Sequence, residues 1–356
     1  MAARTCVIFG VSGIVGRNLA EHLIALGGWN VVGVSRHPPL GLKEIEHRSS
    51  DLASAADVRT ALAGLGPIAC AFYATWSRQP DEHANCLTNG AMFRNAIHAV
   101  AEQGGLEHVA LVTGTKQYLG SFDSYARTEL KTPFAEDQPR VPGENFYYVQ
   151  EDILFDAAGR FGFHWSVARP HTIIGYAPGN AMNLGTSLAV FASLCRETGR
   201  PFRFPGSPQQ YGFLTDMTDA RLLAKHLVWE ATEPKARDRA FNVVNGDVFR
   251  WKHMWPLIAA SLDVVPADYR GVASPLVEQL KDAEADWQAL VSRRNLKPFR
   301  LAEIAPLWHV DGDLGRTQEC VNDMTLSREL GFTTYQRTAT AFSDLFDRLR
   351  RERIIP

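Results

Sequence analysis

Short apolar runs alternate with helical periodicity over the first half of the chain. The apolar runs are rich in β-branched and aromatic side chains, as in buried parallel strands, and span residues 5–10, 30–36, 68–76 and 108–114. Apolar residues recur at helical spacing over residues 14–26, 54–65 and 85–102. Strand–helix units of this length predict a parallel sheet with helices on both faces, which is the doubly wound, Rossmann-type α/β fold.

The second half of the chain has a less regular pattern. Residues 118–144 contain scattered proline, glycine and charged residues, which predicts a long functional loop. The later helix-like and strand-like stretches are residues 146–162, 164–170, 181–199 and the mostly helical 275–356. We therefore predict a dinucleotide-binding Rossmann domain over residues 1–175, with return segments at about 210–245. A smaller, mostly helical substrate-binding extension over residues 176–356 is expected to pack on it.

Composition limits the function classes. The 37 Lys and Arg residues balance 39 Asp and Glu residues, so the basic excess of a nucleic-acid-binding domain is missing. A 46% hydrophobic share with 21% charged residues excludes a disordered chain, collagen or a coiled coil. No run of about 18 apolar residues predicts a membrane span, and the first residues show no signal-peptide pattern. We expect a soluble cytoplasmic protein and leave open whether it forms a homodimer.

Neither a disulfide framework nor a metal site is indicated. The cysteines lie far apart without a C-x-x-C pair and are expected to be free thiols: Cys6, Cys70, Cys86, Cys195 and Cys320. The eleven histidines lack the spacing of known zinc motifs. We therefore expect no metal cofactor.

The stretch GVSGIVG lies directly between the first predicted strand and the first predicted helix. Its three glycines allow a tight turn, close approach of the backbone to a pyrophosphate, and close packing of the helix on the strand. The amides at the start of the helix then face the phosphates. This position favours dinucleotide binding over a purely structural turn. The expected contacts are Gly10, Ser12, Gly13, Ile14, Val15 and Gly16.

The end of the second strand indicates which dinucleotide binds. NAD-binding proteins place an acidic residue there for the ribose 2′-hydroxyl, whereas this chain has Ser35 and Arg36. A guanidinium pairs with a 2′-phosphate through charge-assisted hydrogen bonds, so we predict NADPH/NADP+ as the cofactor. The alternative for Arg36 is a solvated surface residue. Asp51 and Leu52, after the third strand, are expected near the adenine.

The catalytic Tyr-x-x-x-Lys pair that is usual in short-chain dehydrogenases is missing. Tyr147 and Tyr148 are followed at that spacing by Glu151 and Asp152, but Lys116 follows the strand that ends at the cofactor. Reduction of a conjugated carbonyl compound needs a donor aimed at the oxygen where negative charge develops. A tyrosine whose pKa is lowered by a neighbouring cation would serve, and Lys116 would supply that cation.

The order of these motifs, over nearly the whole chain, resembles one family. The matching stretches are GVSGIVG, the Ser-Arg pair at 35–36, YATW, ANCLTNGAMFRNAI, VTGTKQYLG, KTPFAED, NFYYVQEDIL, VARP, FNVVNGDVFRWKHMW and the final IIP. They are similar to those of the progesterone 5β-reductase and iridoid synthase-like family, atypical short-chain dehydrogenases that use NADPH. In that family the lysine of T-G-x-K-x-Y-x-G and the first tyrosine of NFYY are catalytic, which implies Lys116 and Tyr147 here.

The resemblance implies NADPH-dependent reduction of the C=C bond of enones, by hydride addition to the β-carbon. Tyr147 is expected to stabilise the enolate, and Lys116 to keep the phenol acidic and to hold the ribose; the final proton comes from solvent or from the tyrosine. The other expected cofactor contacts are Tyr73, Ala74, Thr75, Thr113, Gly114, Lys116, Tyr147, Pro170, Ile173, Asn180 and Met182. The expected contacts to a small apolar enone are Trp76, Phe122, Tyr125, His171, Thr172 and Phe213.

Three departures from the family pattern bear on the substrate. The chain reads RPHTIIG where plant members often read RPGNIFG, and it has Asn180 where a serine often lies. After the tyrosine pair, Val149 and Gln150 replace more acidic or bulky residues. Because the first of these stretches lines the expected active site, we expect a different substrate shape with the same reaction class.

Two alternatives are left open. An extended short-chain dehydrogenase acting on a sugar nucleotide or a ketone shares the glycine loop and the length, but it requires the Tyr-x-x-x-Lys pair that this chain lacks. A non-catalytic NADP-sensing regulator has the fold, but it usually loses the catalytic tyrosine, whereas Tyr147 is present here.

Overall fold

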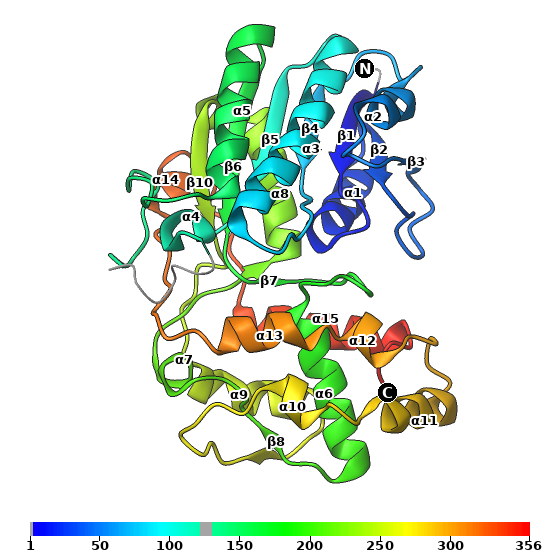
Figure 1. The fold of residues 1–356 in the computed structure, drawn as a ribbon, viewed down its shortest axis with the longest axis vertical. Helices are drawn as coiled ribbons and strands as arrows, with labels where there is room; N and C mark the ends of the chain where they lie inside the picture. Colours follow the sequence, from blue (N-terminus) through cyan, green and yellow to red (C-terminus); the bar gives the residue numbers. More distant parts are fainter. Residues whose placement is uncertain (1–2, 122–129) are drawn as a thin grey trace. The chain divides into compact units, whose positions relative to one another are not determined.

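The structure is a computed structural model that describes residues 3–121 and 130–356 (Figure 1). The chain forms two compact units. The first comprises Met1–His171, Arg221–Val243 and Asn322–Thr334, and the second comprises Thr172–Ala220, Val244–Val321 and Tyr335–Pro356. Each unit therefore contains segments that are far apart in the sequence.

A parallel sheet with the strand order β10-β6-β5-β4-β1-β2-β3 forms the centre of the first unit. Its strands are β1 (Arg4–Phe9), β2 (Trp29–Ser35), β3 (Glu46–Ser49), β4 (Cys70–Tyr73), β5 (His108–Val112), β6 (His164–Pro170) and β10 (Arg239–Val243). The helices are α1 (Ile14–Leu26), α2 (Ala55–Leu62), α3 (Glu82–Glu102), α4 (Lys116–Leu119), α5 (Phe146–Phe161), α8 (Ala220–Thr232), η2 (Pro234–Ala236) and α14 (Thr325–Glu329). This arrangement confirms the predicted Rossmann-type fold.

Helices cover both faces of this sheet (Figure 1). Val58 of α2, Phe93 of α3 and Leu154 of α5 share one apolar core with strand residues such as Val109. α1 and α8 lie on the opposite face. Because both faces are buried, the central strands carry continuous apolar runs, which is the pattern that the sequence shows.

Two boundaries differ from the sequence prediction for identifiable reasons. The edge strand β3 has the polar sequence EHRS, so no apolar run marks it, and it is defined by its pairing with β2. α3 begins at Glu82, before the predicted start at residue 85. The cause is the side chain of Asp81, which caps the helix by accepting a hydrogen bond from the backbone N–H of Ala84 (2.8 Å).

A buried chain of polar side chains joins the later segments to the sheet. His108 Nε2 of β5 lies 2.9 Å from Ser166 Oγ of β6, and that hydroxyl donates to Glu230 of α8 (2.7 Å). Glu230 also lies 2.6 Å from His226 Nδ1, and His226 Nε2 lies 3.0 Å from Ser327 Oγ of α14. Each of these side chains is at most 2% exposed. Because polar groups buried without partners are costly, these contacts fix α8 and α14 against the strands.

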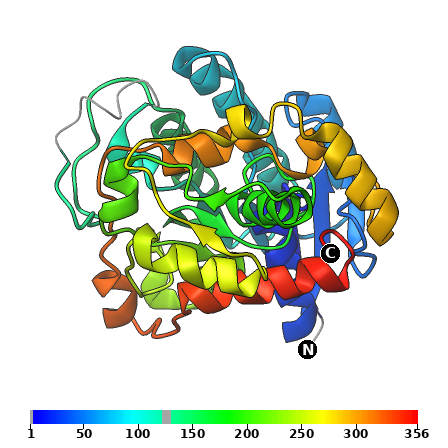
Figure 2. The same cartoon turned by 90° about the horizontal axis from the view of Figure 1, so that it is seen from below.

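The second unit is mainly helical and is built around α6 (Leu184–Thr198), which Figure 2 shows end-on. Its other helices are α7 (Pro208–Gly212), α9 (Trp251–Ser261), α10 (Leu276–Gln279), α11 (Glu284–Arg294), α12 (Leu301–Ile304), α13 (Leu307–Leu314) and α15 (Thr338–Arg351). Its strands are β7 (Ile173–Ile174), β8 (Phe202–Arg203), β9 (Thr218–Asp219) and β11 (Pro266–Ala267). α11, α12, α13 and α15 pack around the buried side chains of α6, so the predicted helical C-terminal part is confirmed.

The buried histidine of β5 predicts a specific pH dependence of stability. Burial lowers the pKa of His108 to about 3 from its ordinary 6.5, so the folded state keeps this imidazole neutral where the unfolded chain is protonated. This stability is fully present above pH 6.5 and is lost as the pH falls toward 3, at up to about 1.4 kcal/mol per pH unit. We expect urea unfolding between pH 7 and pH 4.5 to show a shallower pH slope for His108→Gln than for the wild type. The exposed His253→Gln is the control, and equal slopes in all three proteins would contradict the prediction.

Candidate active site

The turn between β1 and α1 is tight enough to require glycine. Gly10 has a φ of +87°, and a Cβ at this position would lie 2.6 Å from the carbonyl oxygen of Ala74 and 2.7 Å from Cβ of Thr75. A Cβ at Gly16 would overlap the backbone of Gly10, so α1 lies directly against the turn. Gly13 is the N-cap and places no side chain over the first amides of the helix. The turn can therefore admit a pyrophosphate close to the backbone.

Some of the predicted cofactor residues have side chains that belong to the core of the first unit. Tyr73 is fully buried, with its ring 4.7 Å from that of Phe93. Leu52 is 6% exposed, and its carbonyl accepts a hydrogen bond from Asn95 of α3 (2.9 Å). The side chains of Ile14 and Val15 are also buried, whereas Ser12 is exposed. The side chains of these buried residues therefore pack in the core of the first unit.

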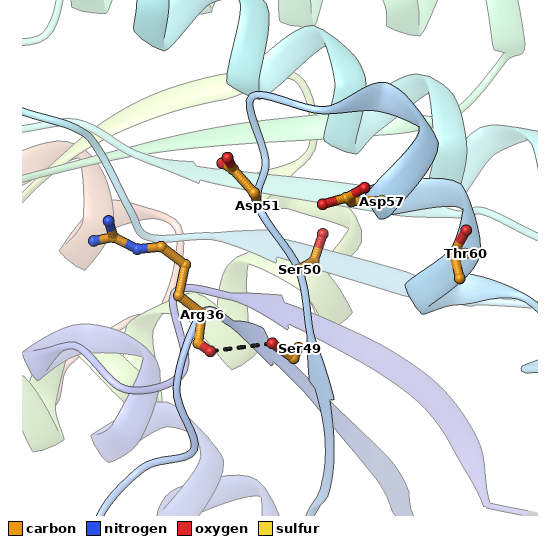
Figure 3. Close-up of a pocket in the computed structure, with 6 residues that line it drawn as sticks. All are labelled: Arg36, Ser49, Ser50, Asp51, Asp57 and Thr60. Carbon is orange, nitrogen blue, oxygen red and sulfur yellow. Dashed lines mark hydrogen bonds between the residues drawn. The ribbon is translucent and has the colours of Figure 1, made fainter.

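A pocket of about 370 Å³ lies at the carboxyl ends of β2 and β3 (Figure 3). It is lined by Arg36, Ser49, Ser50, Asp51, Asp57 and Thr60. Figure 3 shows the guanidinium of Arg36 on one side and the carboxylates of Asp51 and Asp57 on the other. Ser50 Oγ is buried and has no hydrogen-bond partner among the described residues. The structure thus brings Arg36 and Asp51 together, and adds polar residues that the sequence did not single out.

The guanidinium of Arg36 differs from those of its neighbours. Arg17 is bound to Glu21 (3.1 Å) and to a backbone carbonyl, and Arg48 is bound to Glu46 (2.6 Å). The guanidinium of Arg36 has no hydrogen-bond partner among the described residues. Its backbone carbonyl accepts a hydrogen bond from the Ser49 hydroxyl (3.1 Å). The charged group is exposed and available at the edge of the pocket. The hydroxyl of Ser35, in contrast, donates to the carbonyl of His37 (2.8 Å).

Lys116 and Tyr147 are brought together from separate elements. Lys116 opens α4 after β5, and Tyr147 is in the first turn of α5. The N-cap of α5, Asn145, accepts a hydrogen bond from the Tyr147 N–H (3.1 Å) and donates one to the carbonyl of Lys116 (3.1 Å). A Cβ on Gly114 would lie 3.4 Å from the Tyr147 hydroxyl and 3.1 Å from the Pro170 carbonyl. Four of the predicted site residues therefore meet at the carboxyl ends of β5 and β6.

A buried ion pair holds these elements in place. Arg169 of β6 donates to Glu151 of α5 (3.0 Å) and to the Tyr118 hydroxyl of α4 (3.2 Å). The Tyr118 hydroxyl donates in turn to Asn242 of β10 (2.6 Å). Each of these side chains is buried. The contacts connect the two helices that carry Lys116 and Tyr147 to the sheet.

The two adjacent tyrosines have different surroundings. The hydroxyl of Tyr148 donates to the carbonyl of Gln117 (2.7 Å) and accepts from the N–H of Val141 (3.0 Å). The hydroxyl of Tyr147 has no hydrogen-bond partner within residues 3–121 and 130–356, and its side chain is partly exposed. Tyr148 therefore anchors the loop and α4, and Tyr147 is left with a donor for a ligand.

The electrostatics of the pair differ from the sequence-based expectation. Lys116 Nζ lies 5.5 Å from the ring centre of Tyr147 but donates a hydrogen bond to the carboxylate of Glu82. Burial, together with the charge of Glu82, raises the pKa of Tyr147. Burial also lowers the pKa of Lys116, while Glu82 opposes that change. The prediction that Lys116 makes this phenol more acidic is therefore wrong, and the phenol keeps its proton at neutral pH.

Glu82 is a site residue that the sequence analysis missed. It stands at the start of α3, where an acidic residue is ordinary, so nothing in the local pattern marks it.

The indole of Trp76, a predicted substrate contact, stacks on Phe146 next to Tyr147 (5.5 Å between ring centres). Lys116 Nζ lies 4.3 Å from the centre of the same Phe146 ring.

The other predicted residues are divided between the units. Thr113 and His171 are buried in the first unit, where Thr113 N–H donates to the Ala168 carbonyl (2.9 Å). The second unit contains Thr172, Ile173, Asn180, Met182 and Phe213. The Thr172 hydroxyl donates to Asp313 (2.5 Å), and Asn180 accepts from the Met182 N–H (3.1 Å). Phe122 and Tyr125 lie outside the described residues.

Metal-ligand clusters and membrane-spanning helices are both absent from the residues that the structure describes. No group of three or more His, Cys, Asp or Glu side chains there could hold a metal ion. No helix in that part is long and apolar enough to cross a membrane. The five cysteines are buried and free, as predicted.

Comparison with known proteins identifies a family. The PRISE-like Rossmann-fold domain matches residues 41–356. The chain is 37% identical to an (S)-8-oxocitronellyl enol synthase of Nepeta racemosa, over 98% of this chain and 92% of that protein. It is also 37% identical to a 3-oxo-Δ4,5-steroid 5β-reductase of Arabidopsis thaliana, with the same coverage.

A solved structure supports the fold. A short-chain dehydrogenase/reductase superfamily protein of Agrobacterium tumefaciens with bound NAD has a TM-score of 0.65 and 13% sequence identity. The match covers 99% of this chain and 98% of that one. At this identity the likeness concerns the fold alone.

The contrast between the two tyrosines predicts different effects on stability. Tyr148→Phe leaves a buried carbonyl and a backbone N–H without their partner, so we expect the free energy of unfolding to fall by about 1–3 kcal/mol. Tyr147→Phe removes a hydroxyl with no partner in the described structure, so we expect a change within about 0.5 kcal/mol. Urea unfolding of both variants tests this. Equal losses would show that the Tyr147 hydroxyl is also bonded within the folded protein.

Proposed function

The chain is an oxidoreductase that belongs to the family with the PRISE-like Rossmann-fold domain, and we propose that it is an NADPH-dependent reductase of the C=C bond of small enones. The observation that carries this proposal is the phenol of Tyr147. It is partly exposed, keeps its proton, lacks a partner in the described structure and lies beside Gly114 at the carboxyl end of β5. Two relatives are named as an enol synthase and a reductase of 3-oxo-Δ4,5-steroids, which agrees with chemistry at a conjugated carbonyl.

The residues of the first unit fit a nicotinamide dinucleotide. The glycine turn has no side chains at Gly10 and Gly16, where a Cβ would collide with Ala74, Thr75 and the backbone of Gly10, so the tight turn before α1 leaves its backbone open to a pyrophosphate. Arg36 offers an exposed guanidinium at the end of β2 that has no partner among the described residues, which favours a 2′-phosphate and hence NADPH over NADH. Asp51 and the buried hydroxyl of Ser50 lie across the pocket, where they can accept from the amino group of adenine. Lys116 would hold the nicotinamide ribose.

When bound, NADPH supplies the hydride for the β-carbon of the enone. Tyr147 donates a hydrogen bond to the carbonyl oxygen, where negative charge develops as that carbon is reduced. The phenol keeps its proton at neutral pH, so it can donate this hydrogen bond. The ammonium of Lys116 adds positive potential near the same oxygen. Trp76, stacked on Phe146, provides an apolar surface for the substrate on this side.

The substrate is proposed to be a small apolar enone, with acceptance across a range of sizes. Apolar pockets discriminate weakly, by about 1–3 kcal/mol per methylene group. The alternative substrate class, a sugar nucleotide, is argued against by the missing Tyr-x-x-x-Lys pair. NADPH consumption with a panel of enones, ketones and UDP-sugars separates these classes, and detection of the saturated ketone as product separates C=C from C=O reduction.

Removal of the Tyr147 hydroxyl tests the mechanism. One preorganised donor at a developing oxyanion contributes roughly two to three orders of magnitude to kcat. We expect Tyr147→Phe to lose that much turnover of a small cyclic enone while its Kd for NADPH, measured by fluorescence titration, stays near the wild-type value. Tyr335→Phe, at a tyrosine that is 72% exposed, is the matched control. Turnover of Tyr147→Phe at the wild-type rate would refute the role of the phenol.

The Arg36 side chain tests the cofactor preference. A hydrogen bond to a charged group contributes about 1.5–3 kcal/mol, which corresponds to roughly a tenfold to hundredfold change in affinity. We expect Arg36→Ala to raise KM for NADPH by that factor and to leave KM for NADH almost unchanged. The control is Arg48→Ala, which removes a nearby arginine that is already paired with Glu46. A similar effect of Arg36→Ala on both cofactors would show that the 2′-phosphate binds elsewhere.

A further inference from the structure

The carboxylate of Glu82 accepts two hydrogen bonds from separate elements. One comes from Nζ of Lys116 on α4, and the other from the backbone N–H of Phe146, the first residue of α5 (2.8 Å). The side chain of Glu82 is 9% exposed and that of Lys116 is 4% exposed. Breaking a buried pair by removing one partner is costly, because the other charge is left without compensation. The arrangement is therefore held firmly.

This single carboxylate is connected to both catalytic residues. It directs the ammonium of Lys116, and it bonds the amide next to Tyr147 at the start of α5. Asn145 adds a parallel link, because it bonds both the Lys116 carbonyl and the Tyr147 N–H. The starts of α3, α4 and α5 are thus tied together at one point.

We propose that Glu82 is a positioning residue of the active site: its carboxylate fixes the Lys116 ammonium and the first turn of α5, and so sets the distance and direction between Lys116 and Tyr147. This inference rests on the proposed function. Glu82 acts through Lys116 and Phe146, because its Oε1 accepts hydrogen bonds from Lys116 Nζ and from the Phe146 N–H, and its side chain is only 9% exposed.

The charged groups around the pair give this role a signature in pH. Glu82 and Cys86 face Lys116 from α3, and Tyr147 faces it from α5. Glu144, in the loop before α5, helps to raise the pKa of Cys86. The negative charge of Glu82 favours both the ammonium of Lys116 and the neutral phenol of Tyr147. Without that charge the pKa of each group falls. If the reaction needs Lys116 charged and Tyr147 protonated, activity is then lost at a lower pH.

The first experiment needs neither cofactor nor turnover. Competitive acetylation of the ligand-free protein, read by mass spectrometry, follows the neutral amine of each lysine as the pH rises. Lys252, which is exposed, is the internal reference. We expect Lys116 to become reactive at a lower pH in Glu82→Gln than in the wild type, and close to the wild-type pH in Glu82→Asp, which keeps the charge. Glu144→Gln, which removes an exposed carboxylate bonded to His83, is the control.

The second experiment is the pH profile of kcat/KM for enone reduction. We expect the alkaline limb of the Glu82→Gln profile to move to lower pH. At a pH above the limb, kcat/KM falls about tenfold for each pH unit of this move. We expect the limb of Glu82→Asp to lie close to that of the wild type. A uniform loss at every pH with an unmoved limb and an unchanged Lys116 profile would assign Glu82 a purely structural role and overturn the inference. If Glu82→Gln does not fold, Glu82→Asp decides: a small joint move of its alkaline limb and its Lys116 profile supports the positioning role, whereas a uniform loss of activity with both unmoved overturns it. If the wild type reduces no enone but Lys116 of Glu82→Gln still becomes reactive at a lower pH than in the wild type, the proposed function is refuted. The positioning of Lys116 by Glu82 then still stands.

Discussion

The parallel direction of every strand in the first unit is the constraint from which the site follows. Parallel neighbours cannot be joined by tight turns, so each connection crosses a face of the sheet, mostly as a helix, and the carboxyl ends of the strands meet at one edge. Gly10 follows β1, Arg36 follows β2, Lys116 follows β5, and Pro170 ends β6. Residues that are far apart in the sequence are therefore gathered at that edge without any special interaction between them.

Burial gives the gathered side chains their chemical character. Desolvation raises the pKa of Tyr147 and lowers that of Lys116, so each group tends toward its neutral form. The carboxylate of Glu82 opposes this tendency at Lys116 and reinforces it at Tyr147. On the proposed function, the neutral phenol and the side chain of Lys116 are the groups that stabilise negative charge on a substrate oxygen.

Two buried polar systems hold the framework around the site. Arg169 and Glu151 connect β6 to α5, and the same arginine reaches Tyr118 of α4. On the other face, Glu230 connects β6 to α8 and, through His226, to α14. Unlike apolar contacts, these interactions are directional, so they specify how the elements meet. The segments that return late in the chain thereby complete the unit that carries Lys116 and Tyr147.

The sequence by itself determined the sheet, the glycine turn, the Ser35-Arg36 pair and the positions of Lys116 and Tyr147, because these depend on local periodicity or on short motifs. The polar strand β3 and the capped start of α3 escaped it, because pairing and capping define them instead of an apolar pattern. Only the tertiary structure decided that Glu82 joins the site, that Tyr148 is an anchor while Tyr147 keeps a hydroxyl without a partner in the described structure, and that the pKa of Tyr147 rises. Each of these outcomes is set by burial and by contacts between distant segments, which no local pattern encodes.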